Sequence, residues 1–287
     1  MPQQSDTATL LIHCPDQPGL VHDVTGFLFS HGGNLIDLQQ HIDPLENVFF
    51  MRVEWSLDKF SLDKTEIEPR FSILGKRHQM RWKLQFASDR RRVALFVSKE
   101  SHCLYDLLSR QEAGELPVEI PLIVSNHETL RPAAERFGIP FHHFPITKEN
   151  KASQERAQID LLKKHRIDTV VLARYMQIIS DLLIESYPDN ILNIHHSFLP
   201  AFVGAKPYHQ AYERGVKIIG ATSHYVTAAL DEGPIIHQDV MRVSHEDSVT
   251  DLVRLGKDLE KTVLAKALWW HVMNKVLVYH NKTVVFS

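Results

Sequence analysis

The sequence predicts an α/β protein built from two parts, because the order of strands and helices changes near residue 90. Residues 7–86 carry four strand-like segments and two helical patterns in the order βαββαβ. From residue 93 onward strands alternate with helices, which is typical of a mainly parallel sheet covered on both faces. The charged segment 87–92 is the expected linker, so the expected domains are residues 1–86 and 93–287.

The first part begins with an apolar strand at 7–13. The turn that follows leads into a helix that ends at Gly32 and Gly33, since glycine accepts the left-handed conformation that closes many helices. Alternation of apolar and polar residues then predicts paired strands, followed by a second helix and a last strand. These four segments are 34–43, 48–55, 64–78 and 80–86.

The second part is expected to continue as strand, helix, strand along most of its length. The expected strands are 93–98, 119–126, 141–146, 169–173, 189–194, 218–226 and 234–243, and the helices between the early ones are 103–111, 130–138 and 152–165. Apolar residues at helical spacing predict one long packing helix over 248–274. Residues 275–286 close the chain as a hairpin.

The composition excludes several classes of protein. With 287 residues, 44% of them hydrophobic and 23% charged, the chain can bury a substantial core. A net charge of −3 argues against a general nucleic-acid binder, which is expected to have a basic face. Only Cys14 and Cys103 occur, outside any paired motif, so a reducing cytoplasm fits. The sequence has neither a signal-like opening nor an apolar run of transmembrane length, so no membrane partner is expected.

Residues 193–233 carry the candidate catalytic side chains. Alternation along the short strand before His195 places Asn193 and His195 on the same side, at a strand end where open α/β sheets bind ligands. The strands 218–226 and 234–243 form a hairpin with Asp231 at its tip. Asn193 and His195 can donate to the oxygen that becomes negative when a carbonyl is attacked, and Asp231 can orient or deprotonate a water.

These segments resemble the formyltransferase-fold enzymes that use 10-formyltetrahydrofolate. The signature there is an Asn and a His two residues apart, a Ser-Leu-Leu-Pro-like turn, and an Asp before a Gly-x-Ile-Ile-like strand. Asn193, His195, the turn 197–200 and Asp231 fill these positions, and Phe198 is the one mild departure. The doubled His195-His196 and three further segments are similar to the formyltetrahydrofolate deformylases. Those segments are 97–108, 141–147 and 170–180.

The resemblance implies a Rossmann-like domain that hydrolyses 10-formyltetrahydrofolate to formate and tetrahydrofolate, in support of one-carbon and purine metabolism. It implies Asn193, His195 and Asp231 as catalytic residues, folate as substrate, and no permanently bound cofactor. His196, which stands where a proline is common in the amine-formylating relatives, either orders water or satisfies a loop carbonyl. The residues expected to bind substrate are Arg174, Tyr175, Met176, Gln177, Ile178, His196, Ser197 and Gly233.

The loop 98–102 bears on the choice of acceptor. In the related glycinamide ribonucleotide formyltransferases this loop is glycine-rich and holds the acceptor's phosphate on backbone amides. Here it contains no glycine and adds the carboxylate of Glu100, so a phosphorylated acceptor is disfavoured.

The first part resembles an ACT domain in its D-x-P-G-L turn at 16–20 and its glycine-Asn-Leu-Ile turn at 33–36. The resemblance implies a homo-oligomer and an amino-acid effector, although regulation and simple assembly stay equally open. The residues expected near such an effector are Asp16, Gly19, Leu20, Asn34 and Ile36.

Three alternatives compete with hydrolysis. The first is transfer of the formyl group to an amino acceptor, and the second is a folate or amino-acid sensor whose core only binds. The third is a catalytic metal, since seven histidines could converge, but neither an HExxH motif nor a cysteine pair supports it. Those histidines are His142, His143, His195, His196, His209, His224 and His237.

Overall fold

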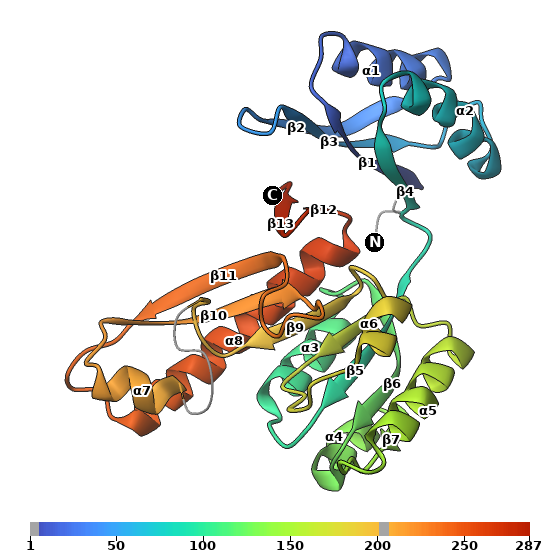
Figure 1. Ribbon diagram of the computed structural model, residues 1–287. Coiled ribbons are helices and arrows are strands. Elements are labelled where there is room, and N and C mark those ends of the chain that lie inside the picture. The colour runs from blue at the N-terminus through green and yellow to red at the C-terminus, as the bar shows by residue number, and fades with distance from the viewer. Residues whose placement is uncertain (1–5, 201–206) are drawn as a thin grey trace. The chain divides into compact units, whose positions relative to one another are not determined.

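The computed structural model describes residues 6–200 and 207–287. By its internal contacts the chain forms two compact units, which are described separately. Of the described residues, the first unit holds 6–90 together with 274–277 and 284–287 near the C-terminus, and the second holds 91–200, 207–273 and 278–283. The elements of both are drawn in Figure 1.

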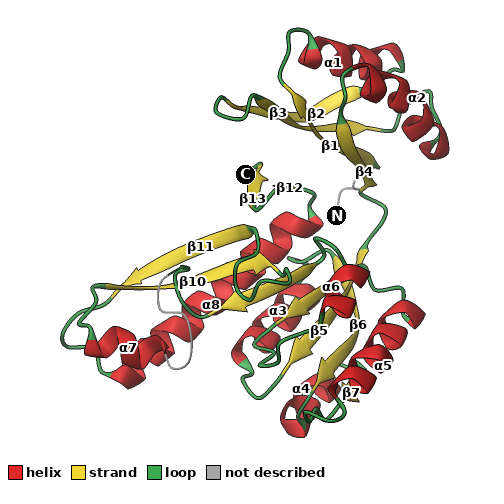
Figure 2. Ribbon diagram, in the orientation of Figure 1, coloured by secondary structure: helices red, strands yellow, loops and turns green. Residues whose placement is uncertain are grey.

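The first unit is a four-stranded antiparallel sheet with two helices on one face (Figure 2). The strands are ordered β2-β3-β1-β4, so β1 is central although it comes first in the chain. The bounds are β1 (Thr7–Pro15), α1 (Leu20–Ser30), β2 (Asn34–Asp43), β3 (Val48–Ser56), α2 (Lys64–Arg77) and β4 (Arg81–Phe86). This is the predicted βαββαβ order.

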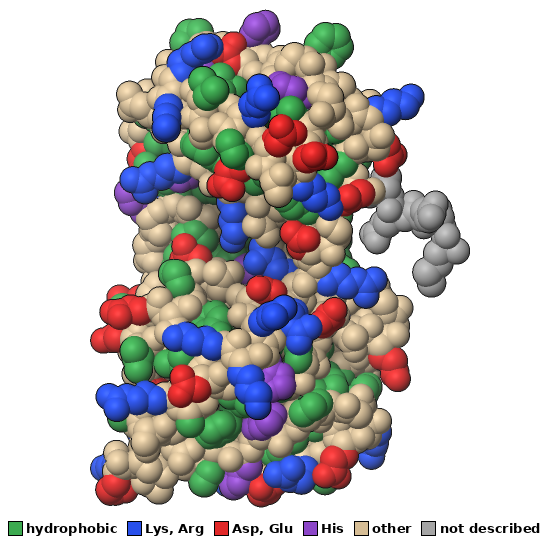
Figure 3. Space-filling view, turned by 90° about the vertical axis from the view of Figure 1, so that its right-hand side faces the viewer, with side chains coloured by type: hydrophobic (Ala, Val, Ile, Leu, Met, Phe, Trp, Pro, Cys, Tyr) green, Lys and Arg blue, Asp and Glu red, His purple; other side chains and the backbone are tan. Residues whose placement is uncertain are grey.

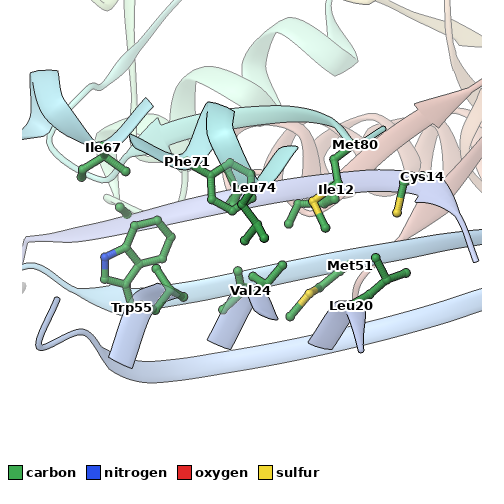
Figure 4. Packing of buried hydrophobic residues seen from close by; sticks show 14 of the residues in the cluster. Ile12, Cys14, Leu20, Val24, Met51, Trp55, Ile67, Phe71, Leu74 and Met80 are labelled. Atoms are coloured by element: carbon green, nitrogen blue, oxygen red, sulfur yellow. The ribbon is translucent and has the colours of Figure 1, made fainter. Parts of the chain in front are cut away.

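The core of the first unit lies between the sheet and the two helices. Trp55 and Met51 on β3 and Ile12 on β1 face Val24 of α1 and Phe71 of α2, and all five are at most 1% exposed (Figure 4). Burial of such side chains stabilises the fold by about 1.5–3 kcal/mol each. The alternating pattern of the strands therefore decides which face the helices cover.

The end of the chain contributes to the first unit. The terminal strands β12 (Val276–Tyr279) and β13 (Lys282–Val285) pair with each other, and Phe286 N–H donates to the Lys275 carbonyl at 2.8 Å. Arg52 is only 2% exposed and donates from Nε to the Asn274 carbonyl at 3.1 Å. Its two terminal nitrogens pair with Asp37 and Glu54.

The second unit is built on a seven-stranded sheet in the order β11-β10-β9-β8-β5-β6-β7. The five strands from β9 to β7 are parallel, and β10 and β11 are antiparallel at one edge. Within this sheet β5 comes first along the chain. The strands β6 and β7 then add on one side of β5, and β8 and β9 add on its other side. The order thus reverses between β5 and β8, and such a reversal opens a crevice at the carboxyl ends of the strands. The strands are β5 (Arg91–Val97), β6 (Val118–Ser125), β7 (Phe141–His143), β8 (Thr169–Leu172), β9 (Ile191–His195), β10 (Ile218–Tyr225) and β11 (Ile235–Arg242).

Helices cover both faces of this sheet. Ile159 and Leu162 of α5 and Leu183 of α6 pack against one face, in a cluster with side chains of β5, β6 and β8. The long α8 lies against β10 and β11 and beside α3 on the other face (Figure 1). The helical segments are α3 (His102–Glu112), η1 (Glu128–Leu130), α4 (Arg131–Arg136), α5 (Lys151–Lys164), α6 (Asp181–Ser186), α7 (Pro207–Glu213) and α8 (Val249–Val272).

The predicted fold class, with an antiparallel first part and a mainly parallel second part, is confirmed. Arg91 and Arg92, which the sequence analysis assigned to the linker 87–92, form the start of β5. Arg92 belongs there because its backbone N–H and Nε donate to Asp168 and to the His165 carbonyl, at 2.8 and 2.9 Å.

The surface has mixed charge. On the face shown in Figure 3, lysine and arginine side chains are interspersed with aspartate and glutamate, and neither sign dominates. Within residues 6–200 and 207–287, no helix is long and apolar enough to cross a membrane.

Candidate active site

The strand β9 brings Asn193 and His195 to the carboxyl edge of the sheet. Its register pairs Asn193 with Leu172 of β8 on one side and with His224 of β10 on the other. His195, the last residue of β9, lies opposite Thr222. Both side chains line a cavity of about 300 Å³ at this edge, as the alternation along the strand predicted.

The loop between β10 and β11 carries Asp231 to the same cavity. Asp231 has a positive φ of 57°, so a left-handed residue turns the chain at this point. Gly233 follows closely, and a Cβ there would lie 1.8 Å from the Tyr225 carbonyl oxygen. Only glycine allows the two backbones to approach this closely, so Gly233 fixes the path of the Asp231 loop.

Asp231 holds His195 in one orientation. The carboxylate oxygen Oδ2 lies 3.3 Å from His195 Nδ1. The imidazole of His195 and the neighbouring ring of His224 keep the pKa of the Asp231 carboxyl well below its usual range, so the carboxylate is ionised at neutral pH. Among the described residues none forms a hydrogen bond with His195 Nε2, although this atom is buried. The ring is therefore anchored at Nδ1, and Nε2 is available to a substrate.

His224 is a site residue that the sequence analysis considered only as a metal ligand. It is 1% exposed, and its Nδ1 lies 2.9 Å from the Tyr225 carbonyl, which can only accept. Nδ1 therefore carries a proton, and Nε2 can accept from Asn193 Nδ2 at 3.2 Å. Asp231 Oδ1 lies 3.6 Å from the same Nε2. His224 thus orients the Asn193 amide, and the β9–β10 register that brings the two together is not visible in the sequence.

The segment after β8 forms the apolar wall of the cavity. Arg174, Tyr175, Met176, Gln177 and Ile178 all line it, as predicted. Met176 and Ile178 are 57% and 62% exposed, which is unusual for large apolar side chains and typical of a binding surface. The loop is tied down at Met176, whose backbone N–H donates to Ser98 Oγ at 3.0 Å. Ser98 in turn donates to Asn126 Oδ1 at 2.6 Å.

His196 stands beside His195, with ring centroids 5.3 Å apart, and also lines the cavity. Burial lowers the pKa of His196 to about 4, and the positive charge of Arg174 acts in the same direction. His196 is therefore a neutral imidazole at physiological pH.

Two predicted substrate-binding residues do not line the cavity. Ser197 is 3% exposed, and its carbonyl accepts from Thr222 Oγ1 at 2.9 Å. Gly233 packs against the Tyr225 carbonyl. Both support the residues that do line the cavity: Ser197 ties the turn after β9 to β10, and Gly233 shapes the Asp231 loop. The part of the resemblance that falls on residues 201–206 lies outside the described residues.

The predicted effector residues lie around the two turns of the first unit. Gly19 has φ 92° and immediately precedes α1, and the Asp16 N–H donates to the Asn47 carbonyl at 2.9 Å. Asn34 and Ile36 are exposed on β2, the latter by 51%. Leu20 is only 2% exposed and packs in the core, so it can offer a ligand its backbone but not its side chain.

The seven histidines of the metal hypothesis do not meet at one point. His195, His196 and His224 share the cavity. His142 and His143 lie in β7, His209 lies in α7, and His237 of β11 packs against Trp270 of α8. Across the described residues, His102, Cys103 and Glu260 make up the single three-residue group close enough to hold a metal ion. Burial raises the pKa of the Cys103 thiol well above its usual value, which opposes the thiolate that a metal needs.

The fold and the site together define an α/β enzyme of the formyl transferase class, preceded by an ACT domain. The formyl transferase family matches residues 91–268 and the ACT domain family matches residues 8–59. A formyltetrahydrofolate deformylase from Synechocystis sp. is 55% identical over 284 residues, which is 99% of this chain and 100% of the relative. One from Bacillus subtilis is 48% identical over 98% of this chain and 94% of its own length.

A solved structure supports the same assignment. The formyltetrahydrofolate deformylase from Pseudomonas syringae pv. tomato is similar with a TM-score of 0.97 and 47% sequence identity, over 100% of this chain and 96% of that one. The chain belongs to the formyltetrahydrofolate deformylase family.

Proposed function

We propose that the chain hydrolyses 10-formyltetrahydrofolate to formate and tetrahydrofolate. The observation that carries the proposal is the pairing of His195 with Asp231, because it leaves the buried Nε2 free at a cavity that Asn193 also lines. The names of the full-length relatives supply the substrate.

In the proposed reaction a water attacks the formyl carbon. Negative charge then develops on the formyl oxygen, and Asn193 Nδ2–H donates to it. His195 donates to the same oxygen from Nε2–H in its protonated form, with Nδ1–H directed at Asp231. One such donor contributes about 10²–10³ in rate. Asp231 is ionised, so it orients the water and accepts its proton, and it also stabilises a positive charge on His195. Collapse of the tetrahedral species breaks the bond to N10 of the folate, which takes a proton and leaves as tetrahydrofolate.

The loop 174–178 binds the folate in this proposal. Met176 and Ile178 flank the pterin ring with apolar surface, and backbone groups of the loop pair with the ring edge. His196 is neutral, so it is suited to accept a hydrogen bond from the attacking water rather than to donate two.

The remaining proposals concern the context of the reaction. We propose a homo-oligomer assembled through the ACT domain, and an amino-acid effector near Asp16 and Asn34. The presence of an ACT domain supports small-molecule binding there. A cytoplasmic location and a role in one-carbon and purine metabolism fit the folate substrate and the two free, buried cysteines.

The test is a time course with purified protein and 10-formyltetrahydrofolate and without any acceptor. Formate and tetrahydrofolate should appear in equal amounts and account for all of the substrate consumed. Tight binding of the folate without formate would contradict hydrolysis and favour a transferase or a sensor.

A further inference from the structure

Residues 173–180 join β8 to α6 and carry the apolar wall of the cavity; they are called the β8–α6 loop below. In the part of the chain that the structure describes, no other backbone group forms a hydrogen bond with the backbone of residues 174–179. The loop begins with the left-handed residue Arg174, at φ 64°, whose Nε lies 3.4 Å from Oε2 of Glu260 on α8. Polar backbone groups that lack such partners are paired by side chains or by water. In this loop, buried side chains of other elements supply partners.

Ser98 holds the middle of the loop. It directly follows β5 and is 2% exposed, and its Oγ accepts from the Met176 N–H at 3.0 Å. The same hydroxyl donates to Asn126 Oδ1 at 2.6 Å. The parallel register pairs Val97 with Ser125, so the next residues of β5 and β6, Ser98 and Asn126, come side by side. A hydroxyl has a single proton, so the bond to Asn126 leaves the oxygen lone pairs for the loop.

A second hydrogen bond holds the end of the loop. Glu155 of α5 is 4% exposed, and its Oε1 accepts from the Ser180 N–H at 3.0 Å. Gln158 of the same helix is fully buried and donates from Nε2 to the Tyr175 hydroxyl at 3.4 Å. The loop is therefore held from β5 and from α5, at its middle and at its end.

These contacts act on the folate wall and not on the reacting groups. Met176 and Ile178 line the cavity, yet 57% and 62% of their surface is exposed, so the loop presents apolar area that a ligand can cover. Asn193 and His195 lie on β9, and Asp231 lies between β10 and β11. Loss of a contact beneath the loop should therefore weaken folate binding and leave the chemical step unchanged.

We infer that Ser98 and Glu155 are positioning residues: they hold the β8–α6 loop, in the absence of ligand, in the conformation that binds the folate ring. The inference rests on the proposed function for the identity of the ligand. A ligand that binds one of several loop conformations has an apparent affinity proportional to the fraction of molecules in that conformation. Removal of either side chain lowers this fraction, so the dissociation constant rises. The rate of the bound complex stays the same.

The test measures affinity and turnover separately. Ser98→Ala removes the acceptor of the Met176 N–H. Its Kd for tetrahydrofolate, measured by titration calorimetry, should rise about three- to tenfold, which corresponds to one hydrogen bond. KM for 10-formyltetrahydrofolate should rise with it, while kcat is unchanged. In the ligand-free variant the amides of residues 174–180 should also exchange hydrogen faster than in the wild type.

The Glu155 variants make the test independent of the folding of Ser98→Ala. Glu155→Ala removes the acceptor of the Ser180 N–H and should raise the same Kd. Glu155→Gln retains an amide oxygen as acceptor, so it should keep the Kd of the wild type. A loss of affinity in Ala that Gln restores shows that the hydrogen bond, rather than the charge, holds the loop.

Ser125→Ala is the matched control. Ser125 is fully buried at the end of β6, and its Oγ accepts from the His127 N–H at 3.1 Å and not from the loop, so its loss should leave Kd unchanged. A wild-type Kd in Ser98→Ala and Glu155→Ala, both folded by their thermal midpoints, would overturn the inference. A lower kcat with an unchanged Kd would also overturn it. Absence of formate from the wild type would contradict the hydrolysis instead, and the Kd for tetrahydrofolate would still test the two residues.

Discussion

At the scale of single residues, the site is a chain of side chains that fix one another. Asp231 orients His195 at 3.3 Å, and His224 stands 3.2 Å from the Asn193 amide nitrogen and 3.6 Å from Asp231. Each donor needed for the oxyanion is thereby aimed before the substrate arrives. Such preorganisation, rather than the mere presence of the groups, lowers the barrier.

His224 should therefore affect catalysis, although it is not one of the predicted catalytic residues. His224→Ala frees the Asn193 amide, and kcat should fall by about 10²–10³, the value of one oriented donor, with little change in KM. His237→Ala is the matched control, because His237 lies on the neighbouring strand against Trp270 and outside the cavity. Steady-state kinetics of both variants provide the measurement. Equal kcat values for His224→Ala and His237→Ala would contradict the proposed role of His224.

Because His196 is buried as a neutral imidazole, the free energy of unfolding should depend on pH. Its folded pKa of about 4 lies below the ordinary value of 6.5, so between these values the unfolded chain binds more protons than the folded one. The free energy of unfolding should thus fall as the pH drops from 6.5 to 4, by up to about 3 kcal/mol from this group. In His196→Gln this contribution is absent, so urea denaturation at pH 7 and pH 5 should show a smaller loss. The same loss in both proteins would contradict a neutral, buried His196.

At the scale of elements, the sequence predicted most strands and helices because their periodicity is local. The strand predicted at residues 34–43 agrees with β2, and the helix predicted after the turn agrees with α1, which begins one residue earlier than expected, at Leu20. The placement of Asn193 and His195 on one side followed from alternation alone. The sequence did not predict that Glu260 and His224 lie near the site. The register of β9 and β10 brings His224 to Asn193, and the contact of Glu260 with His102 joins residues that are 158 positions apart in the chain. Leu20 was expected near a ligand but packs in the core, since its turn begins a helix whose apolar face is buried.

The β10–β11 hairpin gives a prediction at this scale. Gly233→Ala places a Cβ 1.8 Å from the Tyr225 carbonyl oxygen, so the strands must separate and Asp231 must move. Both the thermal midpoint and kcat should fall. Gly26→Ala is the control, because nothing lies within 4 Å of a Cβ there and alanine favours the interior of α1 by about 1 kcal/mol. A Gly233→Ala protein with the stability and activity of the wild type would contradict the close approach.

At the scale of the whole molecule, the two ends of the sequence belong to one unit. Periodicity identified the C-terminal hairpin, but it could not show that residues 274–277 and 284–287 group with residues 6–90. That grouping depends on contacts between the two ends of the chain, such as the one between Arg52 and the Asn274 carbonyl.

Phe286 tests this grouping. It is 3% exposed, so Phe286→Ala should cost about 3–5 kcal/mol of local stability and speed amide hydrogen exchange in β1 to β4. Lys282→Ala, an exposed residue of the same hairpin, should leave that exchange unchanged. Unaltered exchange of residues 7–86 in Phe286→Ala would show that the C-terminus does not stabilise the first unit.

The central claim is that Asp231 activates a water at the formyl carbon held by Asn193 and His195. The most direct measurement is the single-turnover rate of formate release from 10-formyltetrahydrofolate by the wild type and by Asp231→Asn, with the folate dissociation constant measured for both. The account predicts a rate lower by about 10²–10⁴ in the variant and a nearly unchanged dissociation constant. Equal rates, with the variant folded and saturated, would contradict it.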